Sequence, residues 1–393
     1  MRLPSFPLVN HGLMAPRLLV GCWCAALLTL GLLVGCEGDY RPRAIGKEGE
    51  VTVVMDSSHW TGSVGSTFRE AVTPWIETLP QPERYFEIRH LELTTERTYE
   101  SIQDLKNVVI VAPLSDSTNE ANFLRRRLSD EARQAVLDGQ SAVVGKPNLW
   151  RRSQRVFFVT AADSTALADV LRDRGETIRS SFEDITLARM EREMYDDARQ
   201  YALEDSLMQR HDFAVNVQHD YQMAIDTTSA SSGFVWLRRI LAKTRREFFV
   251  YYEENASASQ LSPDWIYATQ DSLTRKYLRG NIAGFVRIDY RRSLETEQTT
   301  VLDRFGYQSR GLWHMVKAGQ QQGEFMSVGG GGPFVAYAFY DQPSDRLYLV
   351  HGSVFAPDFD KLQFLRQMEV MANTFRTRAS QQDADSEAVA ETE

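Results

Sequence analysis

The residues best suited to bind something lie together in residues 56–65. Asp56, His59 and Trp60 supply a carboxylate, an imidazole and an indole, and Gly62 and Gly65 let a backbone approach closely. The segment follows an apolar strand pattern and precedes a helical one, and ligands collect at such carboxyl ends of strands in open α/β sheets. We therefore predict a ligand or partner loop here. The alternative is a connecting loop that Trp60 packs against the sheet edge.

Known catalytic and metal-binding patterns are missing from the rest of the sequence. The histidines after residue 36 show no i, i+4 pair, so we expect each on the surface or in the core: His59, His90, His211, His219, His314 and His351. The glycines at 329–332 precede a strand pattern without the Lys-Ser/Thr of a phosphate loop, which predicts a flexible turn. We predict no metal, no cofactor and no identifiable catalytic residue, although the abundant acids leave a carboxylate hydrolase open.

The three cysteines, Cys22, Cys24 and Cys36, all lie near the start, so none remains for a disulfide in the folded part. Arg17 precedes an uncharged run that ends at Leu33-Val34-Gly35-Cys36, which is the pattern of a signal peptide. This ending resembles the bacterial lipobox, at which the cysteine is diacylated and becomes the N-terminus. We therefore expect a signal peptide over residues 1–35 and a lipid on Cys36; the alternative is an uncleaved membrane helix.

The composition is that of a packed, acidic protein. With 393 residues, 43% of them hydrophobic, the chain has room for two domains. The formal charge of −9 becomes −11 without residues 1–35, which carry Arg2 and Arg17 and no acid. Such a surface repels polyanions, so nucleic acid is not an expected partner.

The elements that must position these residues form two domains. After a tether at residues 36–50, strand patterns at 51–55, 85–93, 108–111 and 155–160 alternate with helical patterns at 64–76 and 121–137. This order predicts an α/β domain over residues 51–162 with a parallel or mixed sheet. A long connecting helix is predicted over residues 163–211, either solvated or with a narrow partner-binding stripe.

Residues 212–376 carry seven further strand patterns and two helical ones, the first of them capped by Ser262. This order predicts an antiparallel α+β sandwich, and its aromatic-rich strands suggest that it folds by itself. The acidic tail, residues 377–393, has a disordered composition.

Two resemblances add to this interpretation. The whole mature chain resembles a family of Gram-negative envelope lipoproteins known as domain of unknown function 4837. The residues that carry the resemblance include Gly46-Lys47-Glu48-Gly49-Glu50, Phe234-Val235-Trp236-Leu237-Arg238-Arg239 and Gly332-Pro333-Phe334. The layout of the second domain is similar to PsbP-like sandwiches, which implies an accessory or assembly role. Together these features predict a lipid-anchored binding or assembly module of the envelope, on the outer membrane facing the periplasm. Its expected partners are the membrane, through Cys36, and another envelope protein or ligand; the alternative function is an envelope hydrolase.

Overall fold

The computed structural model describes residues 39–382, apart from residues 141, 197, 280–283 and 322. Contacts divide the chain after Pro42 into two units, and the described fold lies in the second, which starts at Arg43. The expected signal peptide and Cys36 lie outside the described residues. Among the helices of the described part, none is long and apolar enough to span a bilayer.

The fold begins within the segment that was expected to be a tether. Ile45 bridges to Leu105, and the carboxylate of Glu48 accepts a hydrogen bond from Arg189 Nε at 3.0 Å. Glu48 also pairs with Lys106 at 2.5 Å, while Arg189 Nη2 donates to Asn107 Oδ1 at 3.1 Å. Because a buried guanidinium needs a partner, Glu48 holds residues 43–50 in the first domain. The tether prediction is therefore wrong for these residues.

The first domain is built on a five-stranded sheet in the order β4-β1-β5-β7-β6. The first four of these strands are parallel, and β6 runs antiparallel to β7. The prediction of an α/β domain with a parallel or mixed sheet is confirmed, although the sequence pattern missed the half-exposed edge strand β6. The strands are β1 (Glu50–Val54), β4 (Glu87–Leu91), β5 (Asn107–Val111), β6 (Ala142–Pro147) and β7 (Arg155–Thr160).

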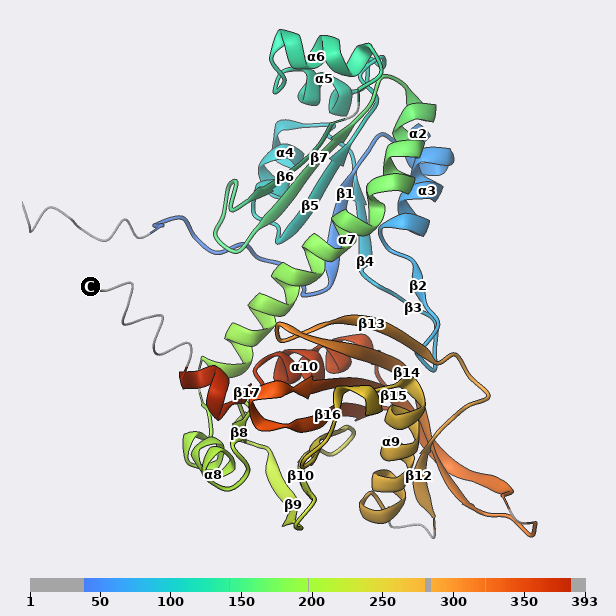
Figure 1. The fold of residues 1–393 in the computed structure, drawn as a ribbon. Coiled ribbons are helices and arrows are strands. Elements are labelled where there is room, and N and C mark those ends of the chain that lie inside the picture. Colours follow the sequence, from blue (N-terminus) through green and yellow to red (C-terminus); the bar gives the residue numbers. More distant parts are fainter. Residues whose placement is uncertain (1–38, 141, 197, 280–283, 322, 383–393) are drawn as a thin grey trace, which may run out of the picture. The chain divides into compact units, whose positions relative to one another are not determined.

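Helices cover both faces of this sheet (Figure 1). Val53 faces the cluster that contains Phe68 and Phe182, and Val54 faces the cluster that contains Ile102. Burial on both faces explains why β1 is apolar throughout. The first face carries α2 (Ser57–Thr61), α3 (Ser63–Ala71) and α7 (Ser164–Tyr195); the second carries α4 (Glu96–Gln103), α5 (Asn119–Arg125) and α6 (Asp130–Leu137). A short hairpin of β2 (Trp75–Ile76) and β3 (Glu83–Arg84) follows α3.

The helix expected over residues 163–211 is two helices. Asp163 caps α7, which ends at Tyr195, and α8 (Tyr201–His211) begins after Gln200, whose backbone N–H donates to Val217 at 2.9 Å. The 32 residues of α7 span about 48 Å. Ten of them are buried, so α7 is a packed element of the core and not a solvated connection. Its buried stripe includes Thr186 and Arg189, which a count of apolar residues does not register.

The second domain is an antiparallel eight-stranded sheet in the order β12-β14-β15-β16-β11-β10-β9, with β13 pairing β14. Its strands are β9 (Gln222–Thr228), β10 (Ser232–Ile240), β11 (Arg245–Glu253), β12 (Phe285–Ile288), β13 (Glu295–Val301), β14 (Arg304–Ala318), β15 (Phe325–Asp341) and β16 (Arg346–Phe355). Separate from it, β8 (Phe213–Ala214) pairs β17 (Arg376–Thr377). Two 3₁₀ turns, η1 (Ala258–Gln260) and η2 (Gln342–Ser344), lie in its connections.

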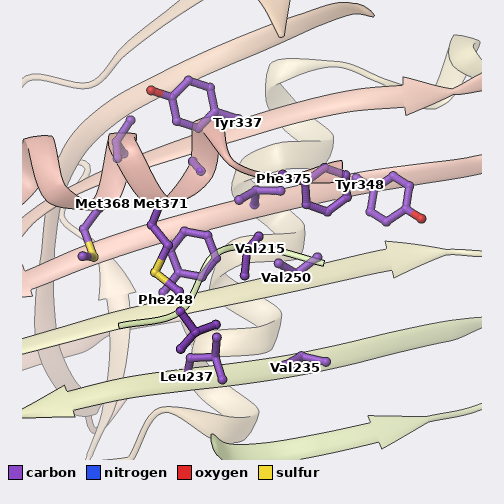
Figure 2. Close-up of a cluster of buried hydrophobic side chains, with 14 of the residues drawn as sticks. Val215, Val235, Leu237, Phe248, Val250, Tyr337, Tyr348, Met368, Met371 and Phe375 are labelled. Atoms are coloured by element: carbon purple, nitrogen blue, oxygen red, sulfur yellow. The ribbon is translucent and has the colours of Figure 1, made fainter. Parts of the chain in front are cut away.

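One helix covers each face of this sheet. Figure 2 shows Met368 and Met371 of α10 (Leu362–Asn373) among buried strand residues such as Phe248. On the other face, α9 (Pro263–Tyr277) lies over Phe234, and its N-cap is Ser262, as the sequence indicates. The prediction of an antiparallel α+β sandwich is confirmed.

The β2–β3 hairpin of the first half completes the core of the second domain. Leu79, between the two strands, is 3% exposed and belongs to the cluster under α10. The carboxylate of Glu83 accepts from the backbone N–H groups of Lys361 and Leu362, at 2.8 and 2.9 Å, and so caps α10. At the chain end, Thr377 pairs with Phe213 and residues 378–382 are helical, so order extends beyond the expected start of the tail. Residues 383–393 lie outside the described part.

Candidate functional site

The segments that follow β1, β5 and β7 meet at His59. Asp56 follows β1 and caps α2, Asp116 follows β5, and Ser164 begins α7 after β7. The carboxyl ends of parallel strands lie at one edge of a sheet, and β1 lies where the strand order reverses. The structure thus places Asp56 and His59 at the edge that the sequence predicted. It adds Asp116 and Ser164, whose proximity depends on strand order and not on spacing in the chain.

The geometry at His59 differs from that of a hydrolase triad. His59 Nε2 lies 2.9 Å from Asp116 Oδ2 and 3.1 Å from Ser164 Oγ, while Nδ1 is 3.9 Å from Asp56 Oδ1. In a Ser-His-Asp triad the serine and the carboxylate contact opposite ring nitrogens. Here Asp116 shares Nε2 with Ser164 and competes for the position from which a base would take the serine proton. The Ser58 hydroxyl donates to Asp56 and lowers the pKa of that carboxyl, which keeps it ionised.

The remaining predicted loop residues pack two helices together. Residues 57–61 and 63–71 are helical, so the expected loop is wrong as a secondary-structure assignment. Half-buried Trp60 stacks on His90 with 4.7 Å between ring centroids, and the Arg69 guanidinium lies 4.5 Å from its ring. A Cβ atom at Gly65 would lie 2.0 Å from the Trp60 carbonyl oxygen, and the N–H of Gly62 closes α2. These contacts agree with the packing alternative for Trp60.

A cavity of about 620 Å³ opens on the α9 side of the second-domain sheet. This volume lies within the range of small-molecule sites. Because side chains alternate along a strand, Trp236, Arg238 and Ile240 of β10 all face it, and the register sets Arg238 opposite Glu247. Its walls come from six strands and the end of α9: Trp236, Arg238, Ile240, Arg245, Glu247, Leu278, Arg279, Val286, Trp313, Met315, Val328, Gly329, Gly330, Ser353 and Phe355.

Glu247 is the single carboxylate in that lining. Burial raises the pKa of Glu247 to about 7, against the opposing effects of Trp236, Arg238 and Arg245. Trp236 Nε1 donates to Glu247 Oε2 at 2.8 Å, which fixes the carboxyl in the cavity wall. Near neutral pH this group therefore exists in both protonation states. A sequence pattern does not reveal it, because its burial depends on which strands flank β11.

Hydrogen-bond donors in the cavity lack partners within the described part of the chain. Trp313 Nε1 and Arg238 Nε are buried without a hydrogen-bond acceptor. Buried donors are nearly always satisfied in folded proteins, so these atoms favour an acceptor that a ligand supplies.

The first two glycines of the run at residues 329–332 line this cavity. The run lies inside β15, not in the expected turn, and the register with β14 shifts between His314 and Val316. Gly329 and Gly330 have φ angles of +91° and +80°, which side-chain-bearing residues rarely adopt. The resulting bulge sets Val328 and the two glycines around the cavity beside Met315.

A second hollow, of about 600 Å³, lies between α7 and strands β13 and β14. Its carboxylates are Glu176, Glu183, Asp184, Glu295 and Glu297. Partial burial raises the pKa of Glu295, and Glu77 and Glu297 add to the shift. Both Glu295 and Glu297 are exposed, and Glu183 is paired with Arg366. Among the described residues, no group of three or more His, Cys, Asp or Glu side chains is placed to hold a metal ion.

The chain folds as an α/β part followed by an α+β part, with a small-molecule-sized cavity in the second part. Residues 200–374 match the family described as "Domain of unknown function (DUF4837)", and residues 44–195 match "Domain of unknown function (DUF8532)". The resemblance to the DUF4837 family thus covers residues 200–374 and not the whole mature chain, because the first half matches a different family model.

The solved structures to which the chain is similar include the Ran-binding protein Mog1p of Saccharomyces cerevisiae. The two are 14% identical with a TM-score of 0.26, over 42% of this chain and 90% of that one. No curated protein matches the chain.

Proposed function

We propose that this protein is a non-catalytic binding module of the bacterial envelope and that the cavity of the second domain is its ligand site. The observation that carries the proposal is the meeting of Glu247, with its raised pKa, and unpaired donors in one largely apolar cavity. Convergent polar groups and a perturbed pKa are the marks of a ligand site. The His59 cluster differs, since its Nε2 atom is already engaged by Asp116 and Ser164.

The envelope location in this proposal rests on the sequence. Leu33-Val34-Gly35-Cys36 after an uncharged run supports cleavage before Cys36 and its acylation. Two or more acyl chains hold a protein stably on a membrane. We assign the module to the outer membrane, facing the periplasm, with an envelope protein or ligand as its partner.

The proposal is tested with the probe 1-anilinonaphthalene-8-sulfonate, which combines an apolar ring system with an acid. The purified full-length chain should bind it saturably at one site, and Met315→Trp, which fills the cavity, should abolish binding without lowering the melting temperature. Met326→Trp is the matched control, because Met326 is exposed on the neighbouring strand outside the cavity lining. Equal binding by all three proteins would overturn the proposal.

The acidic hollow beside α7 supports the second candidate, a hydrolase that uses carboxylates. A general acid needs a raised pKa, and burial raises the pKa of Glu295, with Glu297 two residues along β13 adding to the shift. Loss of glycan or ester hydrolysis in Glu295→Gln, with unchanged folding, would favour this candidate. If the wild-type chain hydrolyses neither glycans nor esters, the hydrolase candidate is rejected.

A further inference from the structure

The lining of the second-domain cavity is divided by charge along the order of the strands. On β12, β14, β15 and β16 the lining side chains carry no charge: Val286, Trp313, Met315, Val328, Ser353 and Phe355. On the adjacent strands β11 and β10 the cavity lining includes three charged side chains, those of Arg238, Arg245 and Glu247. Because β16 pairs β11, the two halves form one continuous floor with a charged end and an apolar end.

The charged half has a surplus of positive charge. Arg238 and Arg245 face one carboxyl, Glu247, whose pKa lies near neutrality. When Glu247 is protonated, this end presents guanidinium groups and a carboxylic acid, all of which donate hydrogen bonds to an anion.

We propose that the ligand is an amphiphile with one acidic head group, its apolar body on β12, β14, β15 and β16 and its acid on β10 and β11. This inference rests on the proposed function, because it names the ligand class of the same cavity. The head group binds Arg238 and Arg245. Both a free fatty acid and an anionic membrane lipid carry this chemistry.

The groups that face Glu247 also fix the pH dependence of binding. Arg238 of β10, the cross-strand partner of Glu247, and Arg245 of β11 are cationic side chains, and Ser353 of β16, its partner on the other side, is uncharged. Ionised Glu247 repels an acidic head group, whereas protonated Glu247 donates to it. Affinity for an acid should therefore rise as the pH falls from 8 to 6, and Glu247→Gln should remove that rise.

Titration of the full-length chain with three probes of equal chain length, below their micellar concentrations, tests the ligand class. Myristate should bind at least tenfold more tightly than monomyristoylglycerol, and tetradecyltrimethylammonium should bind most weakly. Arg238→Gln with Arg245→Gln should weaken myristate binding at least tenfold and leave the glyceride unchanged. Lys243→Gln is the matched control: this exposed cation on the same hairpin pairs with Asp358 at 3.6 Å, and its loss should alter nothing.

The outcomes separate the two proposals. Equal affinity for the three probes, with no effect of the double arginine variant, overturns the acidic-amphiphile inference. If Met315→Trp still abolishes binding of those probes, the proposed function of the cavity as a ligand site stands. No binding of any probe, and no effect of Met315→Trp, overturns both. Vesicles of phosphatidylglycerol that compete with myristate, while phosphatidylcholine vesicles do not, identify a membrane lipid as the source; failure of both to compete identifies a free acid.

Discussion

Arg366 of α10 and Glu183 of α7 form a two-bonded ion pair that joins the two halves of the fold. Arg366 Nε donates to Glu183 Oε1 at 2.8 Å, Nη2 donates to Oε2 at 2.5 Å, and Nη2 also donates to the carbonyl oxygen of Tyr85 at 2.7 Å. Arg366 is fully buried. A guanidinium in that position depends on a carboxylate from the other half of the chain, because a buried charge without a partner is strongly unfavourable.

Removing one partner of this pair should destabilise the protein strongly. We expect Glu183→Gln to cost about 3 to 5 kcal/mol of unfolding free energy, because it leaves Arg366 buried without its counter-charge. Glu183→Gln with Arg366→Met should cost less than the single substitution. Urea unfolding of the three proteins measures this, and a loss below about 1 kcal/mol in Glu183→Gln would show that the pair is not needed.

The same pair makes a prediction about the second domain by itself. A fragment of residues 200–382 should melt cooperatively but at a lower temperature than the full chain, since it lacks Leu79, Glu83 and Glu183. Arg366→Met should stabilise the fragment, where the charge has no partner, and destabilise the full chain. A fragment that does not melt cooperatively would mean that the two halves share one folding unit, against the expectation from sequence.

Glu247 should make stability fall as the pH rises. Its pKa is about 7 in the fold and 4.5 in the unfolded chain, so between these values the folded state holds a proton that the unfolded state has lost. The contribution is complete below pH 4.5 and is lost as the pH rises through 7. The unfolding free energy of the wild type should differ between pH 4.5 and pH 8 by up to about 3 kcal/mol through this group, and Glu247→Gln should remove that difference. Unfolding free energies of wild type and variant that run parallel with pH would contradict this assignment.

His351 should act in the opposite direction. It stacks between Phe249 and Phe334, and burial lowers its pKa to about 3 from 6.5. Stability from this residue is complete above pH 6.5 and is lost as the pH falls toward 3, at no more than about 1.4 kcal/mol per pH unit. His351→Phe keeps the stack and should improve stability at pH 4 more than at pH 7. The denaturant concentrations at the unfolding midpoints of wild type and variant, measured at pH 4 and at pH 7, test this prediction.

Acylation at Cys36 has a direct measurement. The protein purified from membranes should begin at Cys36 and carry the added mass of two or three acyl chains, and Cys36→Ala should leave the membrane fraction. Mass spectrometry that finds Met1 or Met14 in the mature protein would contradict the prediction. Cys22→Ala, at the other Leu-Val-Gly-Cys sequence, is the control and should remain acylated.

The sequence by itself determined the secondary-structure classes of both domains. The apolar run of β1 predicted a strand buried on both faces, and Ser262 marked the start of α9, because both features depend on neighbouring residues. The edge at which Asp56 and His59 lie also followed from the alternation of strands and helices. The tether prediction failed because Glu48 accepts a hydrogen bond from Arg189, which lies 141 residues further along the chain. The single long helix failed because the backbone N–H of Gln200 donates to Val217, a contact that helical periodicity does not report.

Tertiary structure decided the rest. The cavity forms because β14, β15, β16, β11 and β10 lie side by side. The local periodicity of the sequence predicts neither this strand order nor the bulge at Gly329 and Gly330. The pKa of Glu247 and the unpaired Trp313 nitrogen are likewise products of burial. Burial depends on which distant segments pack together, whereas hydrophobic periodicity reports only which face of an element avoids water.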